Sequence, residues 1–139
     1  MTSSKPKKTT KIVKKKITKT KITQQRNKVV CISHKEDADG ISSAALIRQA
    51  FGGDSILVDY PGQMEAIQKI STDEKLKSLY ICDLGLSKKN QDEFVGILRI
   101  LRKNHVSVTY IDHHDIDPKI SKELEKIKVK MIHDINECT

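Results

Sequence analysis

Seven acidic or imidazole side chains follow three apolar runs that are typical of buried strands. They are His34, Asp37, Asp39, Asp83, Asp112, His113 and His114. In open α/β sheets, ligands bind outside the carboxyl ends of the strands, and neighbouring strands bring the loops that follow them to one edge. We therefore expect these side chains to gather at one edge of a sheet.

Carboxylates that lie so close together repel one another, so a positive charge must offset them. A mixed set of Asp and His ligands is typical of manganese, and it also fits magnesium, iron or zinc. Carboxylates that bridge two ions form a two-metal site, which activates water and stabilises charge on phosphoryl oxygens. The sequence therefore predicts a site for two divalent ions, with manganese as the first choice.

The elements that must position these residues alternate between strand and helix. Short β-rich apolar runs predict strands, and apolar residues at helical spacing predict helices. The expected strands are 28–33, 55–60, 78–83, 105–111 and 129–132, and the expected helices are 41–51, 63–70, 89–103 and 118–126. This alternation favours an α/β fold: a doubly wound, mostly parallel five-stranded sheet with helices on both faces.

The net charge of +8 is concentrated at the start of the chain. Residues 1–28 hold eleven Lys or Arg and no acidic residue, whereas residues 29–139 hold 15 basic and 18 acidic residues, a balance of −3. We expect residues 1–27 to be a disordered basic tail that attaches to nucleic acid electrostatically, and residues 28–139 to form the folded domain. A solvated tail without a partner is the alternative.

Composition argues against several other classes of protein. Aromatic residues make up only 4% of the chain and Trp is absent, so a surface of stacked aromatic side chains is not expected. Three widely separated cysteines form neither a C-x-x-C pair nor a disulfide framework, which favours a reducing cytoplasm. No stretch approaches the roughly 18 apolar residues of a membrane span, so no membrane partner is expected.

Three motifs, in this order, resemble those of the DHH family of metal-dependent phosphoesterases, which includes RecJ-type nucleases. They are His34-x-x-Asp37-x-Asp39-Gly40, Asp83 after an apolar strand, and Asp112-His113-His114. The resemblance covers residues 28–139 and implies the N-terminal part of a DHH domain. It implies a RecJ-like hydrolase of phosphodiester bonds in single-stranded nucleic acid or in small oligonucleotides or cyclic dinucleotides.

The resemblance also implies a role for each metal ligand. It implies that His34 and Asp37 hold one metal ion, that Asp39 and His113 hold the other, and that Asp83 bridges both. The spacing within the first motif varies across the family.

Two catalytic roles come from the same resemblance. His114 would face the substrate phosphate, and Asp112 would orient the histidines from behind the metal ligands. Each motif residue also has a purely structural interpretation. Asp37 and Asp39 could simply cap the helix that starts near Ile41, and Asp83 could be an ordinary turn residue.

The chain departs from the family pattern after the third motif. The family's fourth motif supplies a further metal-binding Asp, but only 25 residues follow His114 here, and Asp134 is the one plausible counterpart. Within residues 1–139 we expect no counterpart of the family's C-terminal substrate-binding domain, and Asn136–Thr139 looks like the cap of a further helix. We therefore expect a truncated DHH domain with weak activity by itself. The alternatives are a non-catalytic RecJ-like module that binds nucleic acid or a replication complex, and a manganese-dependent pyrophosphatase.

Overall fold

The computed structural model of the chain describes residues 25–136. Residues 1–24 and 137–139 lie outside the described residues. The predicted basic tail therefore falls almost wholly outside them, and so does most of the helix cap predicted at residues 136–139.

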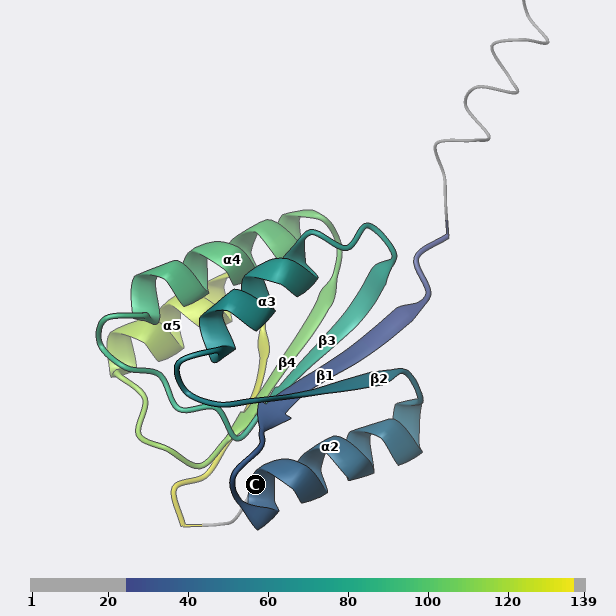
Figure 1. Ribbon diagram of the computed structural model, residues 1–139. Helices are drawn as coiled ribbons and strands as arrows, with labels where there is room; N and C mark the ends of the chain where they lie inside the picture. Colours follow the sequence, from purple (N-terminus) through teal and green to yellow (C-terminus); the bar gives the residue numbers. More distant parts are fainter. Residues whose placement is uncertain (1–24, 137–139) are drawn as a thin grey trace, which may run out of the picture.

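Five strands form one sheet in the order β2-β1-β3-β4-β5 (Figure 1). Every neighbouring pair is parallel. The strands are β1 (Lys28–His34), β2 (Asp54–Val58), β3 (Leu76–Cys82), β4 (Ser107–Asp112) and β5 (Lys130–His133). The sheet confirms the predicted fold class, and it is parallel throughout rather than mostly.

Four helices cover the two faces of the sheet. One face carries α2 (Ala38–Phe51), and the other carries three helices (Figure 1). The three are α3 (Gln63–Ser71), α4 (Gln91–Lys103) and α5 (Pro118–Lys126). This arrangement confirms the predicted helices on both faces. None of the four is long and apolar enough to cross a membrane.

The strand order reverses at β1, which lies between β2 and β3. The chain leaves β1 through α2 on one face, and it leaves β3 through α4 on the opposite face (Figure 1). Loops that diverge in this way open a crevice at the carboxyl ends of the two strands, and this is the usual ligand position in open α/β sheets. The topology therefore directs a ligand to the ends of β1 and β3.

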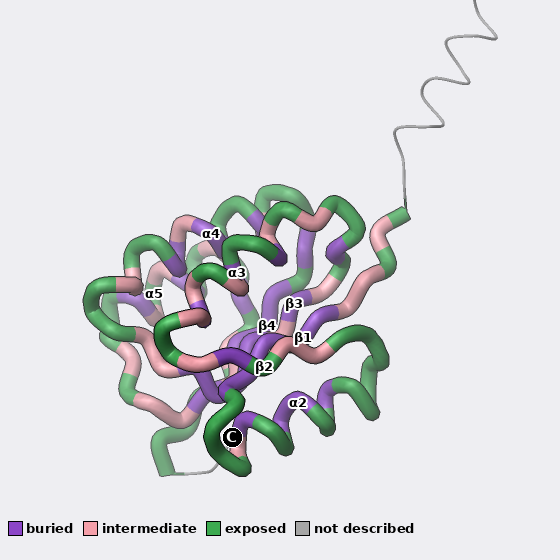
Figure 2. The backbone as a smooth tube through the Cα atoms, in the orientation of Figure 1, coloured by how far each residue is buried: buried purple, intermediate pink, exposed green. Residues whose placement is uncertain are grey.

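The core has two parts, one on each face of the sheet. The larger part packs Phe94, Leu98 and Leu101 of α4 against the strands, and the smaller part packs Ala44 and Ile47 of α2 against two cysteines. The inner strands are buried along most of their length (Figure 2). Burial on both faces explains why these strands are continuous apolar runs rather than alternating patterns.

Most element boundaries differ from the sequence prediction by one to three residues, and two of these differences have identifiable reasons. Helix α2 begins at Ala38, three residues before the predicted start, because Asp37 is its N-cap and accepts a hydrogen bond from the Gly40 amide. Strand β4 begins at Ser107 rather than at His105, because His105 has a φ of 61° and belongs to the turn after α4.

Candidate metal centre

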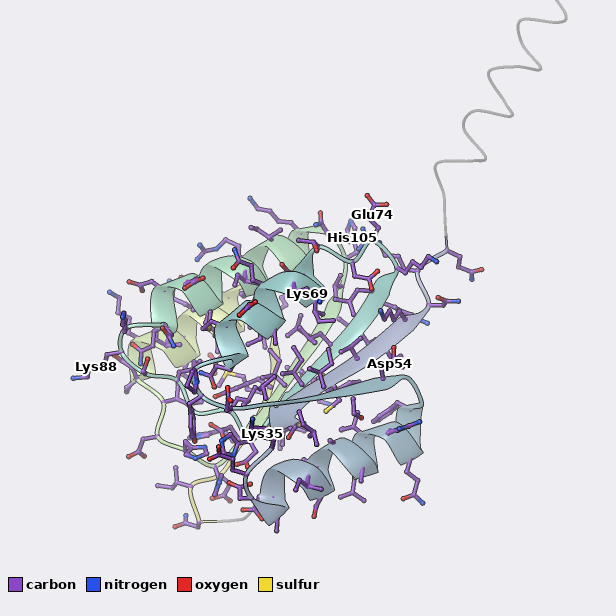
Figure 3. The ribbon with its side chains drawn as sticks, in the orientation of Figure 1. Lys35, Asp54, Lys69, Glu74, Lys88 and His105 are labelled. Carbon is purple, nitrogen blue, oxygen red and sulfur yellow. The ribbon has the colours of Figure 1, made fainter. Side chains whose placement is uncertain are left out.

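The three predicted motifs meet at the carboxyl ends of β1, β3 and β4. Lys35, which directly follows β1, lies at this end of the sheet, and His105 lies at the opposite end (Figure 3). The candidate ligand atoms form two groups, and within each group all of these atoms lie within 4.8 Å of one another. One group consists of Asp83, Asp112, His113 and His114. The other group consists of His34, Asp37 and Asp83. Asp83 is common to both groups, which is the position that a bridging ligand requires.

His34 ends β1 and is almost fully buried, with 4% of its surface exposed. Its Nδ1 lies 3.4 Å from Oδ2 of Asp37, but neither ring nitrogen makes a hydrogen bond within the described residues. The ring packs against Tyr60, with the ring centroids 4.6 Å apart. Because a buried polar atom without a partner is destabilising, a metal ion that accepts a His34 lone pair fits this position.

Gly40 lets the first turn of α2 approach β1 closely. A Cβ atom at this position would lie 2.1 Å from the His34 carbonyl oxygen, so no larger residue fits without a backbone shift. The Ser33 hydroxyl donates to the carbonyl of Gly40, 2.7 Å away, and also lies 3.0 Å from that of Cys82. These contacts fix the N-terminus of α2, which carries Asp37 as its N-cap and Asp39 in its first turn.

Asp37 fulfils the capping role that the sequence left open, and its geometry is compatible with metal binding as well. Its Oδ1 accepts from the Gly40 amide at 2.9 Å, which is the capping role, while its Oδ2 faces His34. The Gly40 hydrogen bond is the main cause that lowers the pKa of Asp37, with His34 adding to it. The carboxylate therefore stays charged, and one of its oxygens remains available to a cation.

Asp83 is the most constrained carboxylate of the site. Only 1% of its surface is exposed, and its backbone has a φ of 54°, a region that residues other than glycine rarely adopt. Its Oδ1 lies 3.1 Å from Nε2 of His113, whereas Oδ2 has no hydrogen-bond partner among residues 25–136. Burial, and then the negative charge of Asp37, raise the pKa of Asp83 to about 6. A cation between these carboxylates would offset that repulsion.

Asp39 lies at the margin of the cluster. The resemblance implied that Asp39 and His113 share one ion, and the structure places Oδ2 of Asp39 4.0 Å from Nε2 of His113. Asp39 belongs to neither group of mutually close ligand atoms. His113 itself is the residue that links Asp39 to Asp83.

Asp112 holds His114 from the end of β4. Its carboxylate is buried, and Oδ1 lies 2.6 Å from Nδ1 of His114. Its Oδ2 lies 3.0 Å from the Tyr110 hydroxyl, which is also 2.8 Å from the Leu84 carbonyl oxygen. Burial lowers the pKa of His114, but the Asp112 hydrogen bond and the surrounding carboxylates raise it by more. Asp112 therefore both orients the imidazole and favours its protonated form.

Three functional residues were not predicted from the sequence. Tyr110 precedes Asp112 by two positions in β4, so strand alternation could have placed both on the same face. Tyr60 and Gln63 follow β2, and they line a pocket of about 360 Å³ beside His114. No motif or periodicity marks these two residues, because their place depends on how β2 and α3 pack beside β1.

Two further acidic residues remain outside the cluster. Asp59 accepts a hydrogen bond from the Gly62 amide at 2.8 Å and pairs with Lys35 at 3.0 Å, so it stabilises the turn after β2. Asp134, the counterpart considered for a fourth motif, follows β5 and accepts a hydrogen bond from the Asn136 amide. Neither belongs to a group of mutually close ligand atoms.

Comparison with known proteins found one distant structural match and no matching family. No protein-family model matches the chain, and no curated protein matches it. Among solved structures, the homoserine dehydrogenase of S. aureus matches with 13% sequence identity and a TM-score of 0.42. The match covers 80% of this chain and 33% of that protein, so the chain spans about a third of its length. A likeness at this level carries no argument about the candidate metal centre.

Proposed function

We propose that this chain carries a DHH-type metal-dependent phosphoesterase site that hydrolyses phosphodiester bonds in single-stranded nucleic acid or in small oligonucleotides or cyclic dinucleotides. The observation that carries the proposal is the pair of ligand groups that share Asp83 at the carboxyl ends of the strands, where the strand order reverses. Buried ligand atoms without a partner, both ring nitrogens of His34 and Oδ2 of Asp83, support it.

The donor set suits two divalent ions, manganese first and magnesium second. His34, Asp37 and Asp83 would hold one ion, and Asp83 and His113 would contribute to the other. Bound metal of this kind supplies an activated water and neutralises charge on phosphoryl oxygens.

His114 is the residue that would meet the reacting phosphate. Asp112 engages Nδ1, so Nε2 is the ring nitrogen left to donate to a substrate oxygen. The raised pKa of His114 favours the protonated ring, which can stabilise negative charge on a phosphoryl oxygen or protonate the departing one. Asp112 and His114 therefore act as one unit.

Two buried cysteines and the basic N-terminal segment bear on where the protein works and on what it binds. Cys31 and Cys82 are buried and free, with their sulfur atoms 3.9 Å apart, well beyond the roughly 2.05 Å of a disulfide bond. Free thiols at this distance favour a reducing cytoplasm as the working compartment. The basic charge of residues 1–28 favours single-stranded nucleic acid as the polymer that the protein meets there.

The test is manganese-dependent hydrolysis of a short single-stranded oligonucleotide, of pApA and of pyrophosphate by the purified chain. The double variant Asp112→Ala/His113→Ala is the blank. Glu36→Gln is the matched control, because Glu36 is an exposed carboxylate in the same loop as Asp37 and belongs to neither ligand group. We expect weak diester hydrolysis by the parent and by Glu36→Gln, and none by the blank.

Other outcomes select the alternatives. Hydrolysis of pyrophosphate alone would indicate a pyrophosphatase. Manganese-dependent binding of the oligonucleotide without cleavage would indicate a non-catalytic module. Equal turnover of the diester by the parent and the blank would show that the cluster is not the active site.

A further inference from the structure

A pocket of about 360 Å³ lies beside the candidate metal centre, on the side of α3 and α4. His114 and Tyr60 both line it, and Tyr60 also packs against His34. The pocket and the metal ligands therefore share a wall. The volume lies at the lower end of the roughly 300–1,000 Å³ of small-molecule sites, so it suits a single small ligand group rather than a length of polymer.

Gln63 gives this pocket a specific polar group. Only 2% of its surface is exposed, and its Nε2 donates to the Gly85 carbonyl oxygen at 3.2 Å. Because that carbonyl can only accept, the amide orientation is fixed and Oε1 is left as a free acceptor. Oε1 is buried and has no hydrogen-bond partner among the described residues. Gln63 also lines the pocket, so a ligand N–H that reached Oε1 would satisfy this buried acceptor.

The remaining lining combines apolar surface with further polar groups. Tyr60 and Leu86 supply apolar contact area, and Asn90 supplies an amide. Asn90 is the residue before α4, and its side chain makes no capping hydrogen bond. Helix α3 likewise starts next to the pocket without a side-chain cap. Ser87 and Asp115 add a hydroxyl and a carboxylate to the lining. A wall that combines apolar contact area with several hydrogen-bonding groups is typical of a site that recognises a heterocycle.

We propose that this pocket binds the terminal nucleotide of the substrate, with Oε1 of Gln63 accepting an N–H of the base and Tyr60 packing against the base. The inference rests on the proposed function, since a base in this pocket would place its phosphate beside His114. Gln63 and Tyr60 thus select a nucleotide, while the metal ligands act on the phosphate.

The test measures equilibrium binding of AMP and of ribose 5-phosphate to the purified chain in metal-chelating buffer, by NMR titration. The two ligands share the sugar phosphate and differ in the base. We expect AMP to bind about 10-fold tighter or more, the usual effect of one packed base. Gln63→Met should lower AMP affinity about 5–10-fold and leave ribose 5-phosphate unchanged, as loss of one hydrogen bond predicts. Gln68→Met is the control, because Gln68 is an exposed residue of the same helix.

Equal affinity for the two ligands in the parent would overturn the proposal, and so would a full AMP preference in Gln63→Met. If Gln63→Met does not fold, the side-chain amide resonance of Gln63 in the parent decides: AMP must shift it, and an unshifted resonance overturns the proposal. Base-dependent binding without any diester hydrolysis would contradict the proposed phosphoesterase function but support the nucleotide pocket. Diester hydrolysis without base-dependent binding would support the phosphoesterase function but contradict the nucleotide pocket.

Discussion

Nδ1 of His114 lies 2.6 Å from Oδ1 of Asp112, a buried carboxylate at the end of β4. The same carboxylate uses its other oxygen toward Tyr110, so its orientation is fixed from two sides. Asp112 thereby positions a ring that the fold leaves partly exposed beside the pocket. The imidazole is held by a strand end rather than by a flexible loop alone.

We therefore predict that Asp112→Asn lowers the pKa of His114, because the negative charge that raises it is removed while the shape is kept. Hydrolysis should slow about 10–100-fold, the usual effect of losing a group that orients an active-site histidine. NMR titration of the His114 ring measures the pKa directly. An unchanged His114 pKa together with unchanged turnover would show that Asp112 has no orienting role.

A substitution at Gly40 tests whether the close packing of α2 against the His34 backbone keeps the first-motif residues in place. Gly40→Ala should destabilise the fold by about 2 kcal/mol or more and weaken manganese binding, since the new Cβ would collide with the His34 backbone. Gly96→Ala is the control, because Gly96 lies within α4 with nothing within 4 Å of an added Cβ. This control should stabilise the protein by about 0.5–1 kcal/mol. Urea unfolding compares the two, and equal stability would refute the close-packing argument.

The raised pKa of Asp83 should make the stability of the metal-free fold depend on pH in an unusual way. Its pKa is raised to about 6 by burial and by Asp37, against about 3.9 in an unfolded chain. The folded state therefore binds the proton more tightly. This contribution is fully present below about pH 4 and is lost as the pH rises through 6. We expect metal-free Asp83→Asn to be more stable than the parent at pH 7, by up to about 3 kcal/mol, and to lose that advantage at pH 4.

Urea unfolding in metal-chelating buffer at the two pH values measures this difference. Manganese should reverse the order at pH 7, because only the parent gains stability from the bound ion. If Asp83→Asn were less stable than the parent at pH 7 without metal, the claim that the buried Asp83 carboxylate destabilises the metal-free fold would be wrong.

The basic segment supplies a separate prediction about nucleic-acid binding. Deleting residues 1–24 removes nine lysines and keeps Arg26, whose Nη1 donates to the Asn104 carbonyl. Because phosphate contacts release counterions, the logarithm of affinity for single-stranded DNA should fall less steeply with the logarithm of salt in the deleted form. Fluorescence anisotropy at several salt concentrations gives both slopes. Identical slopes would mean that these lysines do not contact the phosphates.

The sequence predicted the order and type of all nine elements within the described residues, because short apolar runs mark the strands and helical spacing of apolar residues marks the helices. It also predicted that His34, Asp83 and Asp112 would meet at one edge, since parallel strands place the loops that follow them together. The strand order could not be predicted in the same way, because no local pattern records that β1 lies between β2 and β3. The topological switch point that this order creates is therefore found only in the fold.

Several details of the candidate site could not be predicted from the sequence. The left-handed backbone of Asp83 and the buried amide of Gln63 depend on packing between segments far apart in the chain. The metal grouping differs in one respect from the resemblance, because His114 and Asp112, rather than Asp39, lie in the second group with His113. Such distances follow from tertiary packing, which a motif does not specify.

Manganese binding to the parent and to Asp83→Ala tests the proposed metal centre directly, by calorimetry and by electron paramagnetic resonance on the same samples. Glu36→Gln again serves as the matched control. The account predicts two manganese ions per chain in the parent and in the control, with a spin-coupled signal from neighbouring ions. In Asp83→Ala it predicts loss of the coupling and at least about 10-fold weaker binding, equivalent to about 1.4 kcal/mol. Equal affinity and an unchanged signal in Asp83→Ala would contradict a metal centre built around the residue that both ligand groups share.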